Sequence, residues 1–355
     1  MDKRWKELGN LLVNYSTAVK LGERVMVAMV EVETYPLVRA VYEAGIKAGA
    51  HPQVQFLSEE LNRSLLKYGS EEQVEWIPEV EAYGMEWADV YLGLRGAHNL
   101  NVFWDVPSDR LSKFRRTLGK VSAMRWEKTR WCLLRVPNAS LAQEAGVDEE
   151  TITDMFFNAC LLDWPKLSKE WQRWADVLNR GRAVRIVGKN TDLSFSVEGR
   201  KWQVADGKIN MPDGEINTAP VENTVEGEIY FEFPGVLGGR IVPDIHLRWE
   251  KGELVEATAS ANQDFLQEVV KSDPGASRIG EFAFGTNPEM KYFCKDILWD
   301  EKIGGTIHIA LGRAYPENGG TNKSAIHWDI VKDMREDGEV YLDGKLIFQK
   351  GKILI

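Results

Sequence analysis

Strand and helix patterns alternate through the first half of the chain, and this order restricts the fold more than any other feature. The segment 22–30, GERVMVAMV, reads as a buried strand, 34–50 as a helix that ends at Gly49, and 52–58 as a second strand. Two strands that are joined by a helix in this way pair in parallel. The alternation continues as a helix over 71–84, a strand over 88–96, a helix over 109–124 and a strand over 130–137. The sequence therefore predicts an α/β domain with a largely parallel sheet.

A β-rich pattern replaces this alternation in the second half. Two helical stretches over 149–181 form a connector, and short alternating strands with turn residues follow it, interrupted by a helix near 262–272. Because 355 residues exceed the usual size of a single core, two domains are expected. We predict an N-terminal α/β domain over 1–181 that ends with the connector, and a β-rich α+β metal-binding domain over 182–355.

Phosphate-binding glycine motifs are missing from the expected strand ends. VEVETYP follows the first strand in place of GxGxxG, and neither GxxxxGKS nor GxxxxGKT occurs in the chain. These motifs supply the backbone N–H groups that hold phosphates, so a nucleotide role is disfavoured. The net charge of -10 also provides no basic field for nucleic acid or an anionic membrane. We expect neither nucleic acid nor a membrane as a partner.

Cysteine usage and the N-terminal segment indicate the cytoplasm. The three cysteines lie far apart and form no CxxC pair, so neither a disulfide framework nor a thiolate metal site is expected. The opening MDKRWKELGNLLVNYS is charged and amphipathic, without the unbroken apolar stretch of a signal peptide. No window approaches the roughly 18 apolar residues of a membrane helix. The predicted location is therefore the cytoplasm.

Two histidines stand in similar strand patterns near the C-terminus. In GTIHIALG the apolar residues alternate with Thr306, His308 and Ala310, so His308 faces away from the expected core. In SAIHWDIV, His327 and Asp329 share the face opposite the apolar residues. Side chains two residues apart on a strand lie within about 7 Å along its axis and can reach one cation. An isolated HxD is more often a surface pair on a half-solvated strand, so this interpretation needs further donors.

Two glutamates supply those further donors. In RIGEFAFGTN, Glu281 lies opposite the phenylalanines, and small residues flank it on its own face, as they flank His308. Small neighbours leave space for a ligand. In MPDGEINTAP the turn residues predict that Glu215 is held on a loop. The remaining histidines lack such company and are interpreted as solvated or structural: His246, His51 and His98.

Four motifs together resemble one enzyme family. GEINTAP, IGEFAFGTN, GGTIHIALGRAYP and IHWDIV occur in this order, and the chain resembles the thermophilic aminopeptidases, the metallopeptidases of aminopeptidase T and aminopeptidase S type. The resemblance covers essentially the full length, with motif support from about 211 to 331. It implies a homodimeric exopeptidase that removes amino-terminal residues from peptides with two divalent ions, usually zinc or cobalt.

The resemblance also carries site residues onto named positions. The metal set that it implies is Glu215, Glu281, His308, Tyr315, His327 and Asp329. Alternation and neighbouring residues point to all of these except Tyr315, which stands beside Pro316 in a turn and enters on the resemblance alone. The gap between Tyr315 and His327 is short for the family, which puts the substrate-pocket loops in doubt but leaves the metal set complete.

These donors suggest the chemistry of a hydrolase. Imidazole and carboxylate groups suit zinc, cobalt or manganese, with magnesium as a further choice. Two adjacent ions need a bridging carboxylate, for which Glu215, Glu281 and Asp329 are the alternatives. Glu281 is the first candidate to carry a proton from the attacking water to the leaving amine. Tyr315 either binds metal or donates a hydrogen bond to the oxyanion.

A different reaction class also suits part of this set. A mononuclear non-haem iron dioxygenase that opens a dihydroxypyridine ring is the alternative function, because a His, His, Asp triad suits ferrous iron. The two additional carboxylates, Glu215 and Glu281, favour two metals instead. A catalytically dead peptide-binding protein would show a broken ligand position, and all six positions are intact.

Overall fold

The structure is a computed structural model that describes residues 2–99, 101–125 and 128–355, and these form two compact units. Unit 1 is Met1–Leu162 with Gly207–Pro212, and unit 2 is Asp163–Asp206 with Asp213–Ile355. The units thus divide at Leu162, whereas the prediction drew its domain boundary at residue 181. Helix α9 (Trp164–Leu178) belongs to unit 2 because its neighbours do. The Trp202 N–H donates to the Asn179 side chain at its end, at 2.9 Å.

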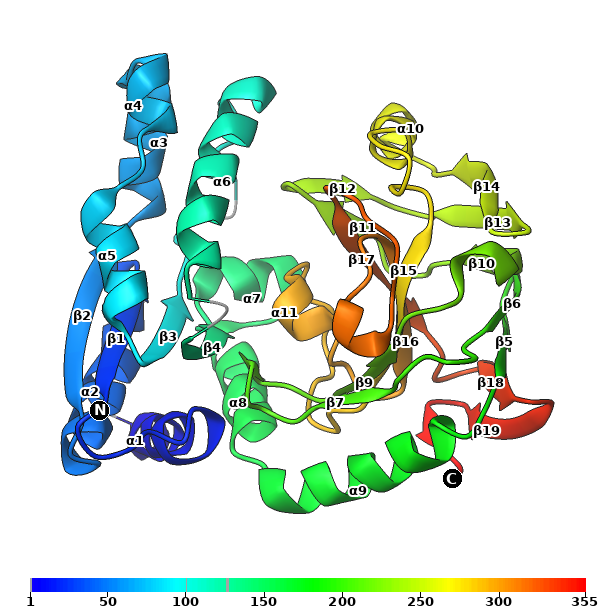
Figure 1. Ribbon diagram of the computed structural model, residues 1–355, viewed down its shortest axis with the longest axis horizontal. Coiled ribbons are helices and arrows are strands. Elements are labelled where there is room, and N and C mark those ends of the chain that lie inside the picture. The colour runs from blue at the N-terminus through cyan, green and yellow to red at the C-terminus, as the bar shows by residue number, and fades with distance from the viewer. Residues whose placement is uncertain (1, 100, 126–127) are drawn as a thin grey trace. The chain divides into compact units, whose positions relative to one another are not determined.

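Unit 1 is an α/β unit with an all-parallel sheet, as predicted. The strand order is β2-β1-β3-β4-β8, and every neighbouring pair is parallel. The strands are β1 (Arg24–Val30), β2 (His51–Leu57), β3 (Val90–Arg95), β4 (Arg130–Arg135) and β8 (Asn210–Met211). The helices are α1 (Lys3–Leu11), α2 (Tyr35–Lys47), α3 (Glu59–Tyr68), α4 (Glu71–Glu75), α5 (Glu79–Trp87), α6 (Ser108–Ala123), α7 (Ala139–Ala145) and α8 (Glu149–Cys160). Figure 1 labels these elements.

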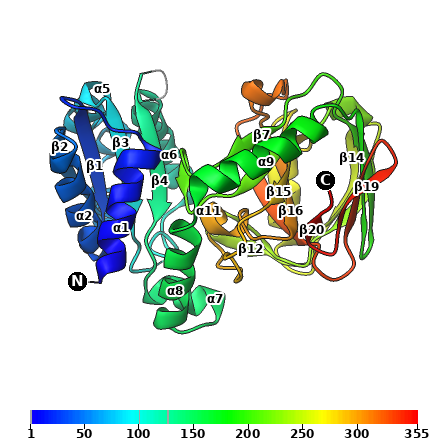
Figure 2. The same cartoon turned by 90° about the horizontal axis from the view of Figure 1, so that it is seen from below.

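Buried side chains fix the helices of unit 1 onto the sheet. Met26, Tyr91 and Leu133 of three adjacent strands form one cluster with Met85 of α5 and Val121 of α6. These two helices therefore cover the same face, and the parallel strands with their helices can be followed in Figure 2. The prediction differs from the structure in two places. The expected helix over 71–84 is interrupted at 76–78, where a proline disfavours the helical conformation of its predecessor. Helix α3 had not been anticipated.

Unit 2 contains two antiparallel sheets and a small hairpin. The larger sheet has the order β14-β13-β10-β6-β5-β18-β19-β20, the second has the order β17-β16-β15-β9-β7, and β11 pairs with β12. The strands are β5 (Ala183–Gly188), β6 (Thr191–Ser196), β7 (Gln203–Ala205), β9 (Glu215–Thr218), β10 (Glu226–Tyr230), β11 (Gly235–Leu237), β12 (Arg240–Val242), β13 (His246–Glu250), β14 (Glu253–Thr258), β15 (Ile279–Gly285), β16 (Thr306–Gly312), β17 (His327–Asp333), β18 (Glu339–Leu342), β19 (Lys345–Gln349) and β20 (Lys352–Ile353). Helix α10 (Gln263–Val270) matches the predicted helix, and α11 (Ile297–Asp300) is a single turn.

The core of unit 2 lies between its two sheets. Phe282 and Phe284 of β15 point toward the larger sheet, where Phe195 lies 5.3 Å from Phe282 and Phe348 lies 5.5 Å from Phe284, measured between ring centroids. Both phenylalanines of β15 are buried. Because successive residues of a strand face opposite ways, this packing turns the alternate residues of β15 toward the other face of the five-stranded sheet.

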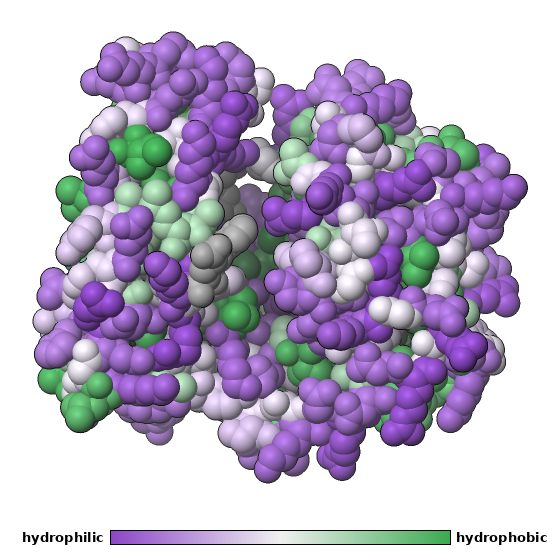
Figure 3. Space-filling model, viewed as in Figure 1, coloured by the Kyte–Doolittle hydropathy of each residue, from purple (hydrophilic) through white to green (hydrophobic). Residues whose placement is uncertain are grey.

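Four short turns lie outside the regular helices and strands. Short π or 3-10 turns occupy Leu12–Ser16, Val32–Thr34, Glu222–Thr224 and Pro316–Asn318. The face seen in Figure 3 is mostly hydrophilic, with hydrophobic residues in small separate patches. Among the described residues, no helix is both long and apolar enough to cross a membrane. The three cysteines, Cys132, Cys160 and Cys294, are buried.

Gly285 allows close contact between β15 and the segment after α11. A Cβ atom at this position would overlap the carbonyl oxygen of Ile303 and approach the Thr306 hydroxyl to 2.7 Å. Replacing Gly285 by alanine should therefore destabilise the protein by about 1–3 kcal/mol, as overpacking of a filled core does. Calorimetric melting of the full chain measures this effect. The control is Gly188→Ala in β5, whose Cβ would meet its nearest atom, Lys332 Cε, at 3.5 Å. Equal melting temperatures for both variants would contradict the expectation.

Candidate metal centre

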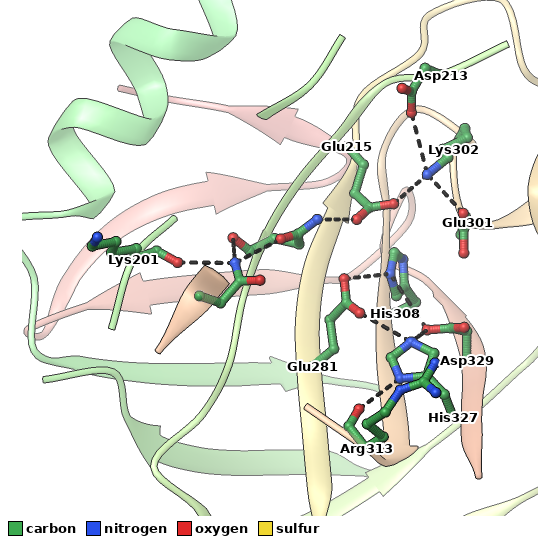
Figure 4. A network of polar contacts seen from close by, with 12 residues as sticks. Lys201, Asp213, Glu215, Glu281, Glu301, Lys302, His308, Arg313, His327 and Asp329 are labelled. Atoms are coloured by element: carbon green, nitrogen blue, oxygen red, sulfur yellow. Dashed lines mark hydrogen bonds and ion pairs between the residues drawn. The ribbon is translucent and has the colours of Figure 1, made fainter. Parts of the chain in front are cut away.

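Polar side chains gather on the face of the five-stranded sheet that points away from the core. In the strand register Glu281 is opposite Ala310, which is opposite Asp329 on the next strand. His308 is opposite Ala283, and Glu215 is opposite Gly285. Residues that are directly opposite share a face, so the pairing brings one set of polar residues together. The set is Glu215, Asn217, Glu281, His308, His327 and Asp329. Figure 4 shows most of it.

His327 stands between two carboxylates with its orientation fixed from behind. Its Nδ1 lies 2.7 Å from the carbonyl oxygen of Arg313, which accepts a hydrogen bond, so Nδ1 must carry the proton. Its Nε2 lies 3.2 Å from Glu281 Oε2 and 3.4 Å from Asp329 Oδ1. A carbonyl on one ring nitrogen commonly orients a metal-binding histidine toward its ion. These three residues form one group whose donor atoms lie within 4.8 Å of one another.

His308 joins this group to a second one. Its Nε2 lies 3.9 Å from both Glu281 Oε1 and Asp329 Oδ1. It also forms a group with Glu215 and Glu301, whose donor atoms again lie within 4.8 Å of one another. The imidazole is fully buried. The two groups therefore adjoin each other at His308.

A buried lysine lies inside the second group. Lys302 Nζ is 2.5 Å from Glu215 Oε2, 2.7 Å from Glu301 Oε1 and 3.4 Å from Asp213 Oδ1. The other oxygen of Glu215 accepts a hydrogen bond from the side chain of Asn217. Figure 4 shows the ammonium group between the three carboxylates. The side chain of Lys302 is only 2% exposed, so this cation is part of the site rather than of the surface.

The pKa values of Glu215 and Glu301, two of the three carboxyl groups around the lysine, shift in opposite directions. Burial opposes the ionisation of Glu215, but Lys302 and His308 outweigh it and lower the pKa of this carboxyl to about 2. Burial raises the pKa of Glu301 to about 8 despite the nearby ammonium. Burial disfavours charge on Lys302, yet the surrounding carboxylates keep its pKa well above the ordinary range. Lys302 and Glu215 thus form a buried ion pair.

The neighbouring carboxylates raise the pKa values of both histidines. Burial opposes protonation of His308, but Glu281, Glu215 and Asp329 together raise its pKa to about 9. The pKa of His327 is also raised, because Asp329 and Glu281 outweigh its burial. Burial acts against ionisation of Asp329, whereas His327 lowers its pKa. A cluster of this kind attracts cations, whether protons or metal ions.

The residues fit a metal ion on three observations. Both ring nitrogens of buried His308 and the buried Oδ1 atom of half-buried Asp329 have no hydrogen-bond partner. Unpaired polar atoms in a protein interior are costly and require an explanation, and a metal ion provides one here. The donors are imidazole nitrogen and carboxylate oxygen, which suit zinc, cobalt or manganese. Small residues, Ala283, Gly285 and Ala310, leave space on the same face.

A comparison with known families decides the class of this protein. The model of the thermophilic metalloprotease family, M29, matches residues 1–353. The chain belongs to the M29 metalloprotease family. Aminopeptidase T of Thermus thermophilus is 26% identical to this metalloprotease over 394 aligned residues, which cover 96% of this chain and 95% of that protein.

Two solved structures share the fold of this metalloprotease. Wild-type AmpT from Thermus thermophilus superposes with a TM-score of 0.89 at 24% sequence identity, and the match covers 99% of each chain. A 2,5-dihydroxypyridine dioxygenase from Pseudomonas putida KT2440 superposes with a TM-score of 0.61 at 16% identity, covering 99% of this chain and 96% of that one. The predicted fold class, an α/β part followed by a β-rich part, is confirmed.

Glu215 and Tyr315 lie near the two histidines of the candidate metal centre, whereas the other three histidines lie elsewhere. Glu215 was expected on a loop, and this was wrong: it begins β9, because its backbone pairs with Gly285. Tyr315 precedes a 3-10 turn, and its ring centroid lies 4.9 Å from that of His327. His246 lies on the larger sheet, 3.1 Å from Glu228. The two remaining histidines, His51 and His98, belong to unit 1, where Nδ1 of His98 lies 2.6 Å from Glu33 Oε2.

The sequence reasoning missed Glu301, Lys302 and Asp213. The run DEK at 300–302 begins at the last residue of the single turn α11, and such charged runs are usually solvated. One signal was available, because this run stands between two apolar residues, Trp299 and Ile303, and both of these are fully buried. A charged pair that is flanked closely by core residues is a candidate for an interior role.

Proposed function

We propose that this metalloprotease is an aminopeptidase that holds two divalent ions on the polar face of its five-stranded sheet. The observation that carries the proposal is the presence of two adjoining donor groups, Glu281–His327–Asp329 and Glu215–Glu301–His308. Family membership supports metal-dependent peptide hydrolysis, and the relative named aminopeptidase T supports the removal of amino-terminal residues. Zinc or cobalt is proposed first, with manganese and magnesium as the alternatives.

The geometry favours Glu281 and Asp329 over Glu215 as the shared ligand. Glu281 offers Oε1 toward His308 at 3.9 Å and Oε2 toward His327 at 3.2 Å. Asp329 approaches both imidazoles with the same oxygen, Oδ1. Glu215 instead directs its oxygens toward Lys302 and Asn217. A ligand shared by two ions would have to face both histidines, and Glu281 and Asp329 do so.

The chain's own residues supply orientation and proton transfer. Divalent ions held by these residues would supply a water of lowered pKa and a polarised scissile carbonyl. Glu281 is proposed to accept the proton of the attacking water and to pass it to the leaving amine, which leaves poorly unless protonated. The backbone carbonyl of Arg313 accepts a hydrogen bond from His327 Nδ1 and so directs Nε2 of His327 toward Glu281 and Asp329. Tyr315 is proposed as a ligand or as a donor to the oxyanion.

The proposal also concerns the substrate class, the oligomeric state and the cellular location. Short peptides with a free amino terminus are the proposed substrates, because a cluster rich in carboxylates attracts an ammonium group. The homodimer implied by the family resemblance and the cytoplasmic location inferred from the sequence stay predictions. Gel filtration with light scattering measures the first, and fractionation of the source cells measures the second.

The second candidate is the mononuclear iron dioxygenase. His308, His327 and Asp329 offer a triad, with Asp329 Oδ1 at 3.9 and 3.4 Å from the two imidazoles. The likeness to the dioxygenase structure concerns the fold alone at 16% identity. A single iron leaves the additional donors Glu215, Glu281 and Glu301 without an ion to bind, and this favours the hydrolase.

Metal removal tests the proposal. A chelator should abolish cleavage of leucine 4-nitroanilide and of a leucine-containing dipeptide, and added zinc or cobalt should restore it, because catalysis requires the ions. Bound metal is counted per chain by mass spectrometry, and restored activity at about two ions per chain is expected. One iron per chain with no cleavage under any metal would overturn the hydrolase. Oxygen uptake with 2,5-dihydroxypyridine then tests the dioxygenase.

A further inference from the structure

The two donor groups differ in what already occupies them. In the Glu215–Glu301–His308 group, Lys302 takes Glu215 Oε2 at 2.5 Å and Glu301 Oε1 at 2.7 Å. Asn217 takes the remaining oxygen of Glu215. In the other group, Glu281 Oε2 and Asp329 Oδ1 lie 3.2 and 3.4 Å from Nε2 of His327, and no lysine or arginine is paired with them among the described ion pairs. One group therefore holds a lysine ammonium among its carboxylates, and the other does not.

The ammonium group of Lys302 has a fixed position. Its side chain is 2% exposed, and three carboxylates surround it: Asp213, Glu215 and Glu301. Asp213 is itself fully buried, and its Oδ1 also accepts the N–H of Gly214 at 3.0 Å. An ammonium group that left this cage would leave buried carboxylates unpaired, which is strongly unfavourable. An ion that enters the group must therefore either displace this ammonium group or bind beside it.

A divalent ion in this group would share its ligands with the lysine. Like charges that share the same carboxylates repel each other, and inside a protein this repulsion is only weakly screened. The ion would also compete with Lys302 for oxygens of Glu215 and Glu301. The Glu281–His327–Asp329 group carries neither disadvantage, because no lysine or arginine is paired with it among the described ion pairs.

We propose that Lys302 makes the two ion sites unequal. The Glu281–His327–Asp329 site binds first and tightly, and the Glu215–Glu301–His308 site binds its ion at least about tenfold more weakly because of the neighbouring ammonium. This inference rests on the proposed two-metal function and adds an order of loading to it. The protein should keep one ion per chain through dialysis and need added metal to load the second.

Zinc titration of the chelator-treated protein by calorimetry tests this order. The wild-type protein should show two steps, and Lys302→Met should tighten the second step at least about tenfold, because the repulsion is removed. Metal counts after dialysis should rise from about one to about two per chain. The matched control is Lys332→Met, which alters another fully buried lysine that pairs with Glu232 at 2.9 Å. The control should keep the wild-type titration.

Each outcome separates the two proposals. Two equal steps in the wild-type protein, or a weaker second step in Lys302→Met, would overturn the role of Lys302. No zinc bound at either step would instead overturn the two-metal function. Where Lys302→Met does not fold, Glu301→Gln decides with the wild-type titration. It removes a donor of the weaker site, so it should abolish the second step and keep the first, and loss of the first step would refute the order.

Discussion

Replacement of His308 by alanine should abolish the ion of the Glu215–Glu301–His308 group and reduce kcat/KM by about 10³-fold or more. The expectation follows from the position of the imidazole, which adjoins both donor groups. A metal ion contributes several kcal/mol to stabilisation of the transition state, and about 4 kcal/mol corresponds to a factor of about 10³. Metal content per chain and steady-state hydrolysis of leucine 4-nitroanilide measure the two effects.

The control for this variant is His246→Ala. His246 also lies on a strand of unit 2 and also faces a carboxylate, Glu228 Oε2 at 3.1 Å, but it belongs to the other sheet. Its removal should change neither metal content nor activity. Circular dichroism and melting establish that the His308 variant is folded, since a buried imidazole is lost. A folded His308→Ala protein with wild-type metal content and activity would refute the proposed centre.

Alternation along single strands predicted much of the polar face. The sequence placed His308 away from the apolar residues of its strand, and His327 with Asp329 on one side of theirs. The register shows these residues on a common face, since His308 and Asp329 lie two positions apart on adjoining strands. Glu281 joins them through its pairing with Ala310. Period-2 patterns are informative here because the opposite face is a core of phenylalanine, isoleucine and tryptophan side chains.

Alternation could not predict two features of this face, which are the burial of its histidines and the strand that carries Glu215. The half-solvated surface strand that is the ordinary explanation for HxD does not occur, because the side chains of His327 and Asp329 are only 12% and 10% exposed and the neighbouring His308 is fully buried. Burial on both faces arises when other segments cover a sheet, and alternation within one strand carries no information on that cover. The turn residues around Glu215 predict a loop, because its strand is only four residues long and its partner β15 lies far along the chain, too short and distant a pairing for alternation to indicate.

Two of the three residues that the sequence did not reveal come from the connection after β15. Glu301 and Lys302 reach the site because Gly285 permits close backbone contact, where the N–H of Gly305 donates to the carbonyl of Gly285 at 3.1 Å. Such a contact depends on tertiary packing and leaves no periodic pattern in the sequence. Tyr315 shows the same limit of local patterns, because only the family resemblance connected a turn tyrosine with the histidine that it contacts.

Replacement of Glu281 by glutamine should separate proton transfer from metal binding. The amide retains an oxygen and nearly the same shape, and the other donors of both groups remain. We therefore expect both ions at saturating zinc, with KM little changed. An amide cannot accept the proton of the attacking water, so kcat should fall by about 10²–10⁴-fold. Metal counts and steady-state kinetics on the same preparation measure both quantities.

Glu228→Gln is the matched control for Glu281→Gln, because Glu228 contacts His246 at 3.1 Å much as Glu281 contacts His327 at 3.2 Å. The control should leave kcat unchanged. If Glu281→Gln lost metal in proportion to activity, Glu281 would be a ligand without a role in proton transfer. Proton transfer would then have to come from another carboxylate of the cluster, and Asp329 would be the next to test, since its Oδ1 faces both imidazoles. Full activity with both ions bound would remove Glu281 from the mechanism.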